Sequence, residues 1–212
     1  NKIDKTIYLG DVLGIGPEPD KCLNLIMENN IEMVLGNHEL YHVRGTGIDL
    51  EMSDNEKLHH SWVKSKLTDN HYAFLSKKTL SIMVKENGYK LIFQHFLIDE
   101  NTVEQYPFHS ICVLKEPIIN QLIDELDTDY IFIGHEHRPY EVEHNNKKLI
   151  DAGSSGCVYN DITHYTVIDI NDTVEVLRRE VKYDRDKLVK TFKSDIKYPM
   201  KEYLSENFFG VK

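Results

Sequence analysis

Short apolar runs followed at once by glycine occur early in this chain, and they predict buried strands. Residues 6–9 read Thr-Ile-Tyr-Leu and residues 33–35 read Met-Val-Leu, and each run stops at a glycine. Between them, apolar side chains at helical spacing predict a helix over residues 20–30, which Asp20 can cap. A strand, a helix and a strand in this order predict a βαβ unit with parallel strands.

The rest of the pattern alternates helices with hairpin strands. Asn87-Gly88, between β-favouring runs at residues 80–86 and 89–94, is a strong hairpin signal. An amphipathic helix is predicted over residues 116–126, and the apolar run at residues 130–133 is typical of a strand buried on both faces. The other predicted elements are helices over 55–67 and 69–76, strands over 140–144, 148–151, 165–170 and 173–181, and two helical pieces within 184–207.

These elements predict an α/β protein with one domain over residues 1–212. Parallel strands early in the chain and hairpins later fit a four-layer α/β/β/α sandwich, with two mixed β-sheets packed together and helices outside. A chain of 212 residues can bury a substantial core. Its apolar runs stay well below the ~18 residues that a membrane span needs, so no membrane association is expected.

Charge and cysteine content narrow the functional classes. The 25 basic and 35 acidic side chains give a net charge of −10. This charge disfavours non-specific nucleic-acid binding, because such binding depends on Lys and Arg neutralising phosphates. The three widely spaced cysteines fit neither a disulfide framework nor a CxxC zinc site, so a cytoplasmic location is predicted.

Four predicted strands each end at side chains that can bind a metal ion. Ligands in open α/β sheets bind beyond the carboxyl ends of the strands, so we expect these side chains to meet at one rim. Oxygen and nitrogen donors without thiolates suit Mn, Fe, Ni or Zn and argue against a structural zinc site. The candidate side chains are Asp11, Asn37, His38, His95, His135 and His137.

With these motifs the chain resembles the calcineurin-like metallophosphoesterase superfamily, and especially its small bacterial branch of phosphodiesterases and dinucleoside-polyphosphate hydrolases. The resemblance implies hydrolysis of phosphodiesters or nucleotide polyphosphates by metal-bound hydroxide at a dinuclear site. The family motifs G-D, G-N-H-[DE], a lone His and G-H-x-H are matched in order by Gly10-Asp11, Gly36-Asn37-His38-Glu39, His95 and Gly134-His135-Glu136-His137.

The resemblance also implies a set of metal ligands. Asp11 would bridge two divalent ions, and His137 would bind the first of them. Asn37, His95 and His135 would complete the second. Manganese is the expected metal, with iron, nickel, zinc or magnesium as alternatives.

Three further residues receive roles outside the metal ligands. His38 would lie beside the leaving group and donate a hydrogen bond or a proton as charge builds on the leaving oxygen. Glu39 is a candidate to orient His38. Arg138, directly after the last ligand, would contact substrate phosphate or be an ordinary surface residue. The expected partner is a small phosphate ester or nucleotide.

The family's opening D-x-H motif is missing before Gly10. We therefore expect a single metallophosphoesterase domain over residues 1–212 that lacks its N-terminal strand with the D-x-H motif. Two alternatives to an esterase of small molecules follow. One is a non-catalytic scaffold of the same fold, although a scaffold has no reason to keep His38. The other is a phosphoprotein phosphatase, which is disfavoured because Gly14 and Ile15 replace the Asp and Arg of that branch.

Other histidine and cysteine side chains are expected to have no catalytic or metal-binding role. His59, His60 and His71 lie in polar helical context and are expected at the surface, whereas Cys22 is expected in the core. Loops at residues 41–49 and 98–109 are expected to set substrate choice. Aromatic side chains near the C-terminus would form either a homodimer patch or, more simply, a helix packed on the domain.

Overall fold

The structure is a computed structural model that describes residues 2–45, 52–98, 116–194 and 197–211. The helices are α1 (Pro19–Glu28), α2 (Asn37–Val43), α3 (Asp54–Lys66), α4 (Asp69–Leu75), α5 (Glu116–Glu125), α6 (Arg185–Ser194) and α7 (Lys201–Phe209). The strands are β1 (Ile7–Tyr8), β2 (Glu32–Met33), β3 (Ser81–Glu86), β4 (Tyr89–Gln94), β5 (Tyr130–Ile133), β6 (Tyr140–His144), β7 (Lys147–Asp151), β8 (Ile162–Ile170) and β9 (Val174–Lys182). The α/β class predicted from the sequence is confirmed.

The predicted βαβ unit is present at the start of the chain. β1 and β2 pair in parallel, with Tyr8 opposite Met33, and α1 connects them. The start of α1 differs from the prediction. The helix begins at Pro19, and a first helical position does not need the N–H that proline lacks. Asp20 lies inside the first turn, where its negative charge interacts favourably with the positive end of the helix dipole.

The first helix after β2 was not predicted. α2 begins directly after Gly36 and contains residues that the sequence places in a turn. Its start is stabilised by Glu39, whose carboxylate reaches back to the N–H of Gly36 at 2.9 Å. The next two helices begin at side-chain caps, since Ser53 accepts from Glu56 before α3 and Thr68 accepts from His71 before α4.

Five strands form one mixed sheet in the order β3-β4-β5-β7-β6. β4, β5 and β7 run parallel at its centre, and the two hairpins add β3 and β6 antiparallel at its edges. The first hairpin turns at Asn87-Gly88 and the second at Asn145-Asn146, and all four turn residues have positive φ, as a tight hairpin turn requires.

The sequence predicts two mixed sheets, and the second of them is divided in the structure. Within the described part of the chain, β1 pairs with β2 and β8 pairs with β9, which gives two separate two-stranded sheets. Both nevertheless pack on the same core of the five-stranded sheet. Leu9 and Ile168 contact a cluster that contains Phe93, Phe132 and Ile150.

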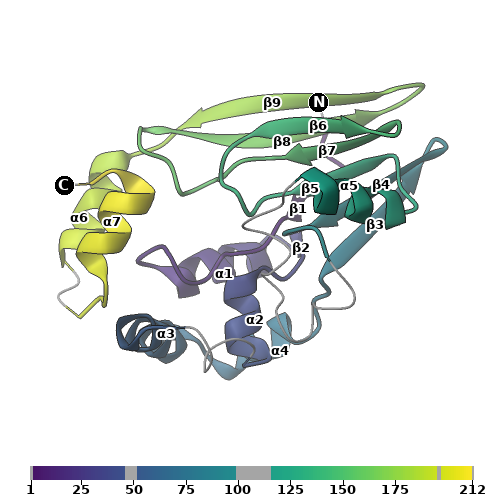
Figure 1. The fold of residues 1–212 in the computed structure, drawn as a ribbon. Coiled ribbons are helices and arrows are strands. Elements are labelled where there is room, and N and C mark those ends of the chain that lie inside the picture. Colours follow the sequence, from purple (N-terminus) through teal and green to yellow (C-terminus); the bar gives the residue numbers. More distant parts are fainter. Residues whose placement is uncertain (1, 46–51, 99–115, 195–196, 212) are drawn as a thin grey trace.

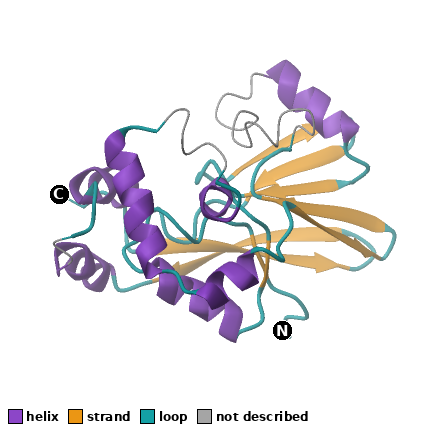
Figure 2. Ribbon diagram, turned by 90° about the horizontal axis from the view of Figure 1, so that it is seen from below, coloured by secondary structure: helices purple, strands orange, loops and turns teal. Residues whose placement is uncertain are grey.

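Helices pack on the outer face of the five-stranded sheet and below β1 and β2 (Figures 1 and 2). α5 packs Leu122 and Ile123 against Ile131 on the face of the five-stranded sheet that points away from β1. α1 to α4 share a second core with β2, which includes Leu23 and Leu40. Figure 1 shows α1 to α4 below the strands.

The C-terminal helices α6 and α7 lie together at one end of the molecule (Figure 1). Phe192, Tyr198 and Phe209 are buried in a core that also contains Ile15. The Tyr198 hydroxyl donates a hydrogen bond of 2.6 Å to the carbonyl of Ile15. Intramolecular packing is therefore the main use of these aromatic side chains, and a homodimer stays a prediction. Tyr203 differs from the other C-terminal aromatic residues Phe192, Tyr198, Phe208 and Phe209, because its side chain is exposed, at 56%.

Among the described helices, none has the length and the apolar surface to cross a membrane. Parts of the two loops expected to set substrate choice, residues 46–49 and 99–109, lie outside the described residues. The expectation that residues 1–212 lack the family's D-x-H strand stays a prediction.

Candidate metal centre

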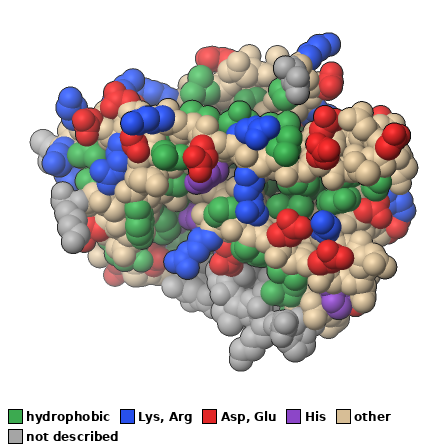
Figure 3. Space-filling view, turned by 90° about the horizontal axis from the view of Figure 1, so that it is seen from above, with side chains coloured by type: hydrophobic (Ala, Val, Ile, Leu, Met, Phe, Trp, Pro, Cys, Tyr) green, Lys and Arg blue, Asp and Glu red, His purple; other side chains and the backbone are tan. Residues whose placement is uncertain are grey.

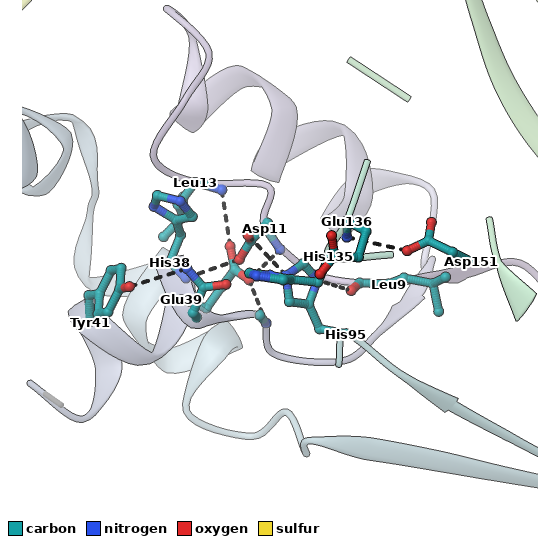
Figure 4. Close-up of polar contacts among 12 residues, drawn as sticks. Leu9, Asp11, Leu13, His38, Glu39, Tyr41, His95, His135, Glu136 and Asp151 are labelled. Carbon is teal, nitrogen blue, oxygen red and sulfur yellow. Dashed lines mark hydrogen bonds and ion pairs between the residues drawn. The ribbon is translucent and has the colours of Figure 1, made fainter. Parts of the chain in front are cut away.

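Four separate segments deliver polar side chains to one place, as the sequence predicts. Asp11 follows β1, His95 follows β4 and His135 follows β5, while His38 lies on α2, after β2. Figure 4 shows Asp11 in the middle of the group, with His38 and Glu39 on one side and His95 and His135 on the other.

Asp11 lies at the centre of this group and contacts both His38 and His95. Its backbone has a φ of 57°, an uncommon conformation for a residue with a side chain. One carboxylate oxygen accepts a hydrogen bond of 3.0 Å from the backbone N–H of His38, and the other lies 3.0 Å from Nε2 of His95. The carboxylate therefore contacts two segments at once, the start of α2 and the end of β4.

The orientation of His95 is fixed by its second ring nitrogen. Nδ1 lies 2.7 Å from the carbonyl oxygen of Leu9, so Nδ1 is protonated and donates a hydrogen bond to that oxygen. Nε2 is thereby directed toward Asp11 and lies 3.0 Å from Nδ1 of His135. Metal-binding histidines commonly donate their other N–H to a carbonyl in this way.

The ligand atoms of Asp11, His95 and His135 all lie within 4.8 Å of one another. Burial raises the pKa of Asp11, but attraction to His95 and His38 outweighs burial, and the net pKa lies well below its ordinary value. Burial and repulsion by His95 lower the pKa of His135 to about 3. An ionised carboxylate beside a neutral imidazole is the protonation state in which these side chains bind a metal cation.

Asn37 is the candidate for a fourth donor. Its amide nitrogen donates a hydrogen bond of 3.3 Å to the hydroxyl of Tyr41, while its amide oxygen is buried and has no hydrogen-bond partner among the described residues. Its neighbour His38 contacts Asp11 through the backbone. A buried amide oxygen without a partner is costly, and a cation beside it would remove that cost.

The group accommodates a divalent ion on these grounds. One carboxylate, one amide oxygen and two imidazoles are an oxygen and nitrogen donor set of the kind that Mn, Fe, Ni and Zn accept. The close approach of the loops also depends on Gly36, because a Cβ at this position would overlap the Asp11 carboxylate.

His137 and Arg138 are less tightly integrated into the group. His137 has a φ of 59°, which turns the chain sharply after His135, and its ring centroid lies 6.1 Å from that of Phe208 on α7. Burial is the main cause that lowers the pKa of His137, and the nearby charge of Asp11 opposes this effect. Arg138 is exposed, and its contact with substrate stays a prediction.

His38 lies beside the metal ligands without joining them. Its ring packs against Gly14, where a Cβ would overlap the imidazole, and meets the edge of the Tyr41 ring at a centroid distance of 5.5 Å. Its Nδ1 is buried and makes no hydrogen bond within the described chain. Burial is the main cause that lowers the pKa of His38.

Glu39 does not have the predicted role of orienting His38 through its side chain. Its carboxylate is fully buried and accepts three backbone hydrogen bonds, from Asp11 at 2.7 Å, Gly36 at 2.9 Å and Leu13 at 3.0 Å. Glu39 therefore ties the loop after β1 to the start of α2. Burial and the nearby Asp11 charge raise its pKa to about 7.

Asp151 was not predicted as part of the site. It is fully buried at the end of β7 and accepts hydrogen bonds from the N–H groups of Gly153 at 2.7 Å and Glu136 at 3.2 Å. Because Glu136 separates His135 from His137, Asp151 holds the segment that carries both. Burial raises the pKa of Asp151 to about 6. Its position directly after an apolar strand was the available sequence signal.

Three histidines expected at the surface are buried. His59 hydrogen-bonds the carbonyl of Gly14, His60 lies 3.3 Å from Nε2 of His42, and His71 lies 2.9 Å from the amide oxygen of Asn24. The polar sequence around His59 and His60 conceals their burial, because α3 buries only these two histidines and Val63. Cys22 differs in the opposite sense and is exposed on α1.

Comparison with known proteins agrees with this geometry. The sequence model of the family described as calcineurin-like phosphoesterase matches residues 1–139. Protein MJ0912 of Methanocaldococcus jannaschii is 27% identical over 227 residues, which cover 98% of this chain and 86% of that protein.

Two solved structures share the fold. A metallophosphoesterase from Sphaerobacter thermophilus superposes with a TM-score of 0.71 at 18% identity, covering 98% of this chain and 89% of that one. Hypothetical protein PH1004 from Pyrococcus horikoshii OT3 superposes with a TM-score of 0.74 at 16% identity, covering all of this chain and 87% of that one. At such identities the likeness shows the fold.

Proposed function

The chain belongs to the calcineurin-like phosphoesterase family, and we propose that this metallophosphoesterase hydrolyses phosphodiesters or nucleotide polyphosphates at a dinuclear centre. The observation that carries the proposal is the convergence of Asp11, His95 and His135, whose ligand atoms lie within 4.8 Å of one another. The buried amide oxygen of Asn37 extends this donor set.

We assign the ligands as follows. Asp11, Asn37, His95 and His135 would hold one divalent ion, and Asp11 with His137 would contribute to a second. Manganese is the first choice, because a mixed oxygen and nitrogen donor set suits it, with iron, nickel, zinc and magnesium as alternatives. When bound, divalent ions polarise a phosphoryl oxygen and lower the pKa of water.

The chain's own residues prepare the site for this reaction. The carbonyl of Leu9 holds His95 in one tautomer, and Glu39 holds the backbone of Asp11, so neither ligand has to reorganise when substrate arrives. We assign to His38 the donation of a hydrogen bond or proton to the leaving oxygen. Its contact with Gly14 supports this role, because it keeps the ring beside the ligands.

The proposed substrate is a small phosphate ester or nucleotide, with Arg138 as a candidate phosphate contact. Non-specific nucleic-acid binding is not proposed, since the chain carries a net charge of −10 and basic and acidic side chains are interspersed on the face shown in Figure 3. The cytoplasmic location stays a prediction from the free cysteines, which include Cys22 and Cys157.

Hydrolysis of bis-p-nitrophenyl phosphate with added Mn²⁺ tests the proposal. We expect turnover that EDTA abolishes and that fresh Mn²⁺ restores. His38→Ala should lower kcat by roughly 10²–10⁴-fold while Mn²⁺ still binds. His164→Ala, on strand β8, is the matched control and should retain full activity.

The outcomes separate the alternatives. Mn²⁺ binding without turnover of any diester or nucleotide would favour the non-catalytic scaffold. Faster turnover of phosphopeptides than of diesters and nucleotides would favour the phosphoprotein phosphatase. The assignment of the site itself would be contradicted if His38→Ala kept full activity and wild-type protein stayed active in the presence of EDTA.

A further inference from the structure

We propose that Tyr41 is a positioning residue for the metal centre and acts through Asn37. The Tyr41 hydroxyl gives the Asn37 amide nitrogen a buried acceptor, which leaves the amide oxygen available for the metal ion. This inference rests on the proposed function, because it takes Asn37 as a metal ligand.

The two residues lie four positions apart on α2, so their side chains lie on the same face of the helix. The Asn37 amide nitrogen donates to the Tyr41 hydroxyl across 3.3 Å, in a buried setting. The amide oxygen is also buried but makes no hydrogen bond in the part of the chain that the structure describes. One end of the amide is therefore satisfied by the protein, while the other is left for a ligand.

The chemistry of the amide explains why the acceptor matters. A cation attracts the amide oxygen and repels the NH₂ group, so metal binding requires that the oxygen face the ion. The NH₂ group of buried Asn37 then has to find an acceptor within the protein, because a buried donor without one is costly. The Tyr41 hydroxyl meets this need.

The ring of Tyr41 is held in place by two histidine rings. Its edge meets His38 at a centroid distance of 5.5 Å and His60 at 4.9 Å, with interplanar angles of 78° and 76°. The side chain is buried, at 9% exposure. The hydroxyl is consequently held at a fixed position relative to Asn37, as a group that orients a metal ligand needs to be.

Tyr41→Phe tests the inference, because it removes the hydroxyl and keeps the ring with its contacts to His38 and His60. We expect the affinity for Mn²⁺, measured from the EPR signal of the free ion, to fall by about tenfold. Tyr72→Phe is the matched control. The Tyr72 hydroxyl on α4 is buried without a hydrogen-bond partner among the described residues, and its loss should leave Mn²⁺ affinity unchanged.

A double-mutant cycle shows whether Tyr41 acts through Asn37. Asn37→Ala should weaken Mn²⁺ binding, and adding Tyr41→Phe to it should cause less than about a twofold further loss. Equal losses in both backgrounds, or wild-type affinity in Tyr41→Phe with an unchanged circular dichroism spectrum, would overturn the inference. Failure of the proposed function gives a different result, namely wild-type protein that does not bind Mn²⁺ or Asn37→Ala protein that binds it as tightly as wild type.

Discussion

The buried carboxylate of Glu39 accepts a hydrogen bond of 2.7 Å from the backbone N–H of Asp11, 28 residues earlier in the chain. The same oxygen accepts from Gly36, and its partner oxygen accepts from Leu13. A side chain in the first turn of α2 thus fixes the backbone that aims the central metal ligand. The position of Asp11 therefore depends on a contact with α2 as well as on the strand before it.

Replacing Glu39 by Gln should destabilise the protein. Glutamine has a single acceptor oxygen, so at least one of the three buried N–H groups loses its partner, which costs about 1–3 kcal/mol. We expect this loss in the free energy of unfolding from urea titration of the metal-free protein. Glu28→Gln, at an exposed position on α1, should change it by less than about 0.5 kcal/mol. Wild-type stability in Glu39→Gln would contradict the assigned role.

Two neighbouring glycines differ sharply in their surroundings and form a matched pair. Gly14 has a φ of 99°, and a Cβ on it would overlap the His38 ring, whereas a Cβ on Gly16 would meet nothing within 4 Å. Gly14→Ala should therefore displace His38 and lower kcat for bis-p-nitrophenyl phosphate at least about tenfold, with a strain of roughly 1–3 kcal/mol. Gly16→Ala should behave as wild type. Equal activity of the two variants would mean that His38 takes no part in the reaction.

Asp151 should be needed for both stability and metal binding. Asp151→Asn replaces one acceptor oxygen by an NH₂ group, so the N–H of Gly153 or of Glu136 loses its acceptor. We expect a loss of about 1–3 kcal/mol in unfolding free energy and weaker Mn²⁺ binding in calorimetric titration. Asp172→Asn, in the exposed turn before β9, is the control. Full Mn²⁺ affinity in Asp151→Asn would restrict Asp151 to a structural role.

The pair formed by buried His60 and half-buried His42 should make the protein sensitive to acid. Burial lowers the pKa of His60 to about 3 and that of His42 to about 4, both from 6.5. Between these values and pH 6.5 the unfolded chain binds protons that the folded chain does not. Stability is therefore fully present above about pH 6.5 and falls as the pH falls, by up to about 1.4 kcal/mol per pH unit for each histidine.

Urea titrations between about pH 4 and 6.5 measure this slope. His60→Gln removes one titrating group, so the decline with falling pH should become shallower by up to about 1.4 kcal/mol per pH unit. The wild-type slope in His60→Gln would contradict the lowered pKa of His60 in the folded state.

The sequence by itself determined the family and the order of the elements other than α2. Asp11, His95 and His135 could be identified because each follows an apolar run, and parallel strands bring such positions to one edge. The hairpins at Asn87-Gly88 and Asn145-Asn146 could also be predicted, because residues that adopt positive φ favour a tight turn whatever the rest of the chain does. These features depend on neighbours in the chain.

Only the tertiary structure decided which residues hold those ligands in place. Glu39 and Asp151 bind backbone N–H groups of other segments, and Tyr41 becomes relevant because it faces Asn37 within a helix that the sequence did not predict. The burial of His60 is also tertiary, because its polar neighbours in sequence suggest a surface. Contacts between distant segments depend on how loops and helices pack, and a linear pattern of apolar and polar residues does not encode that packing.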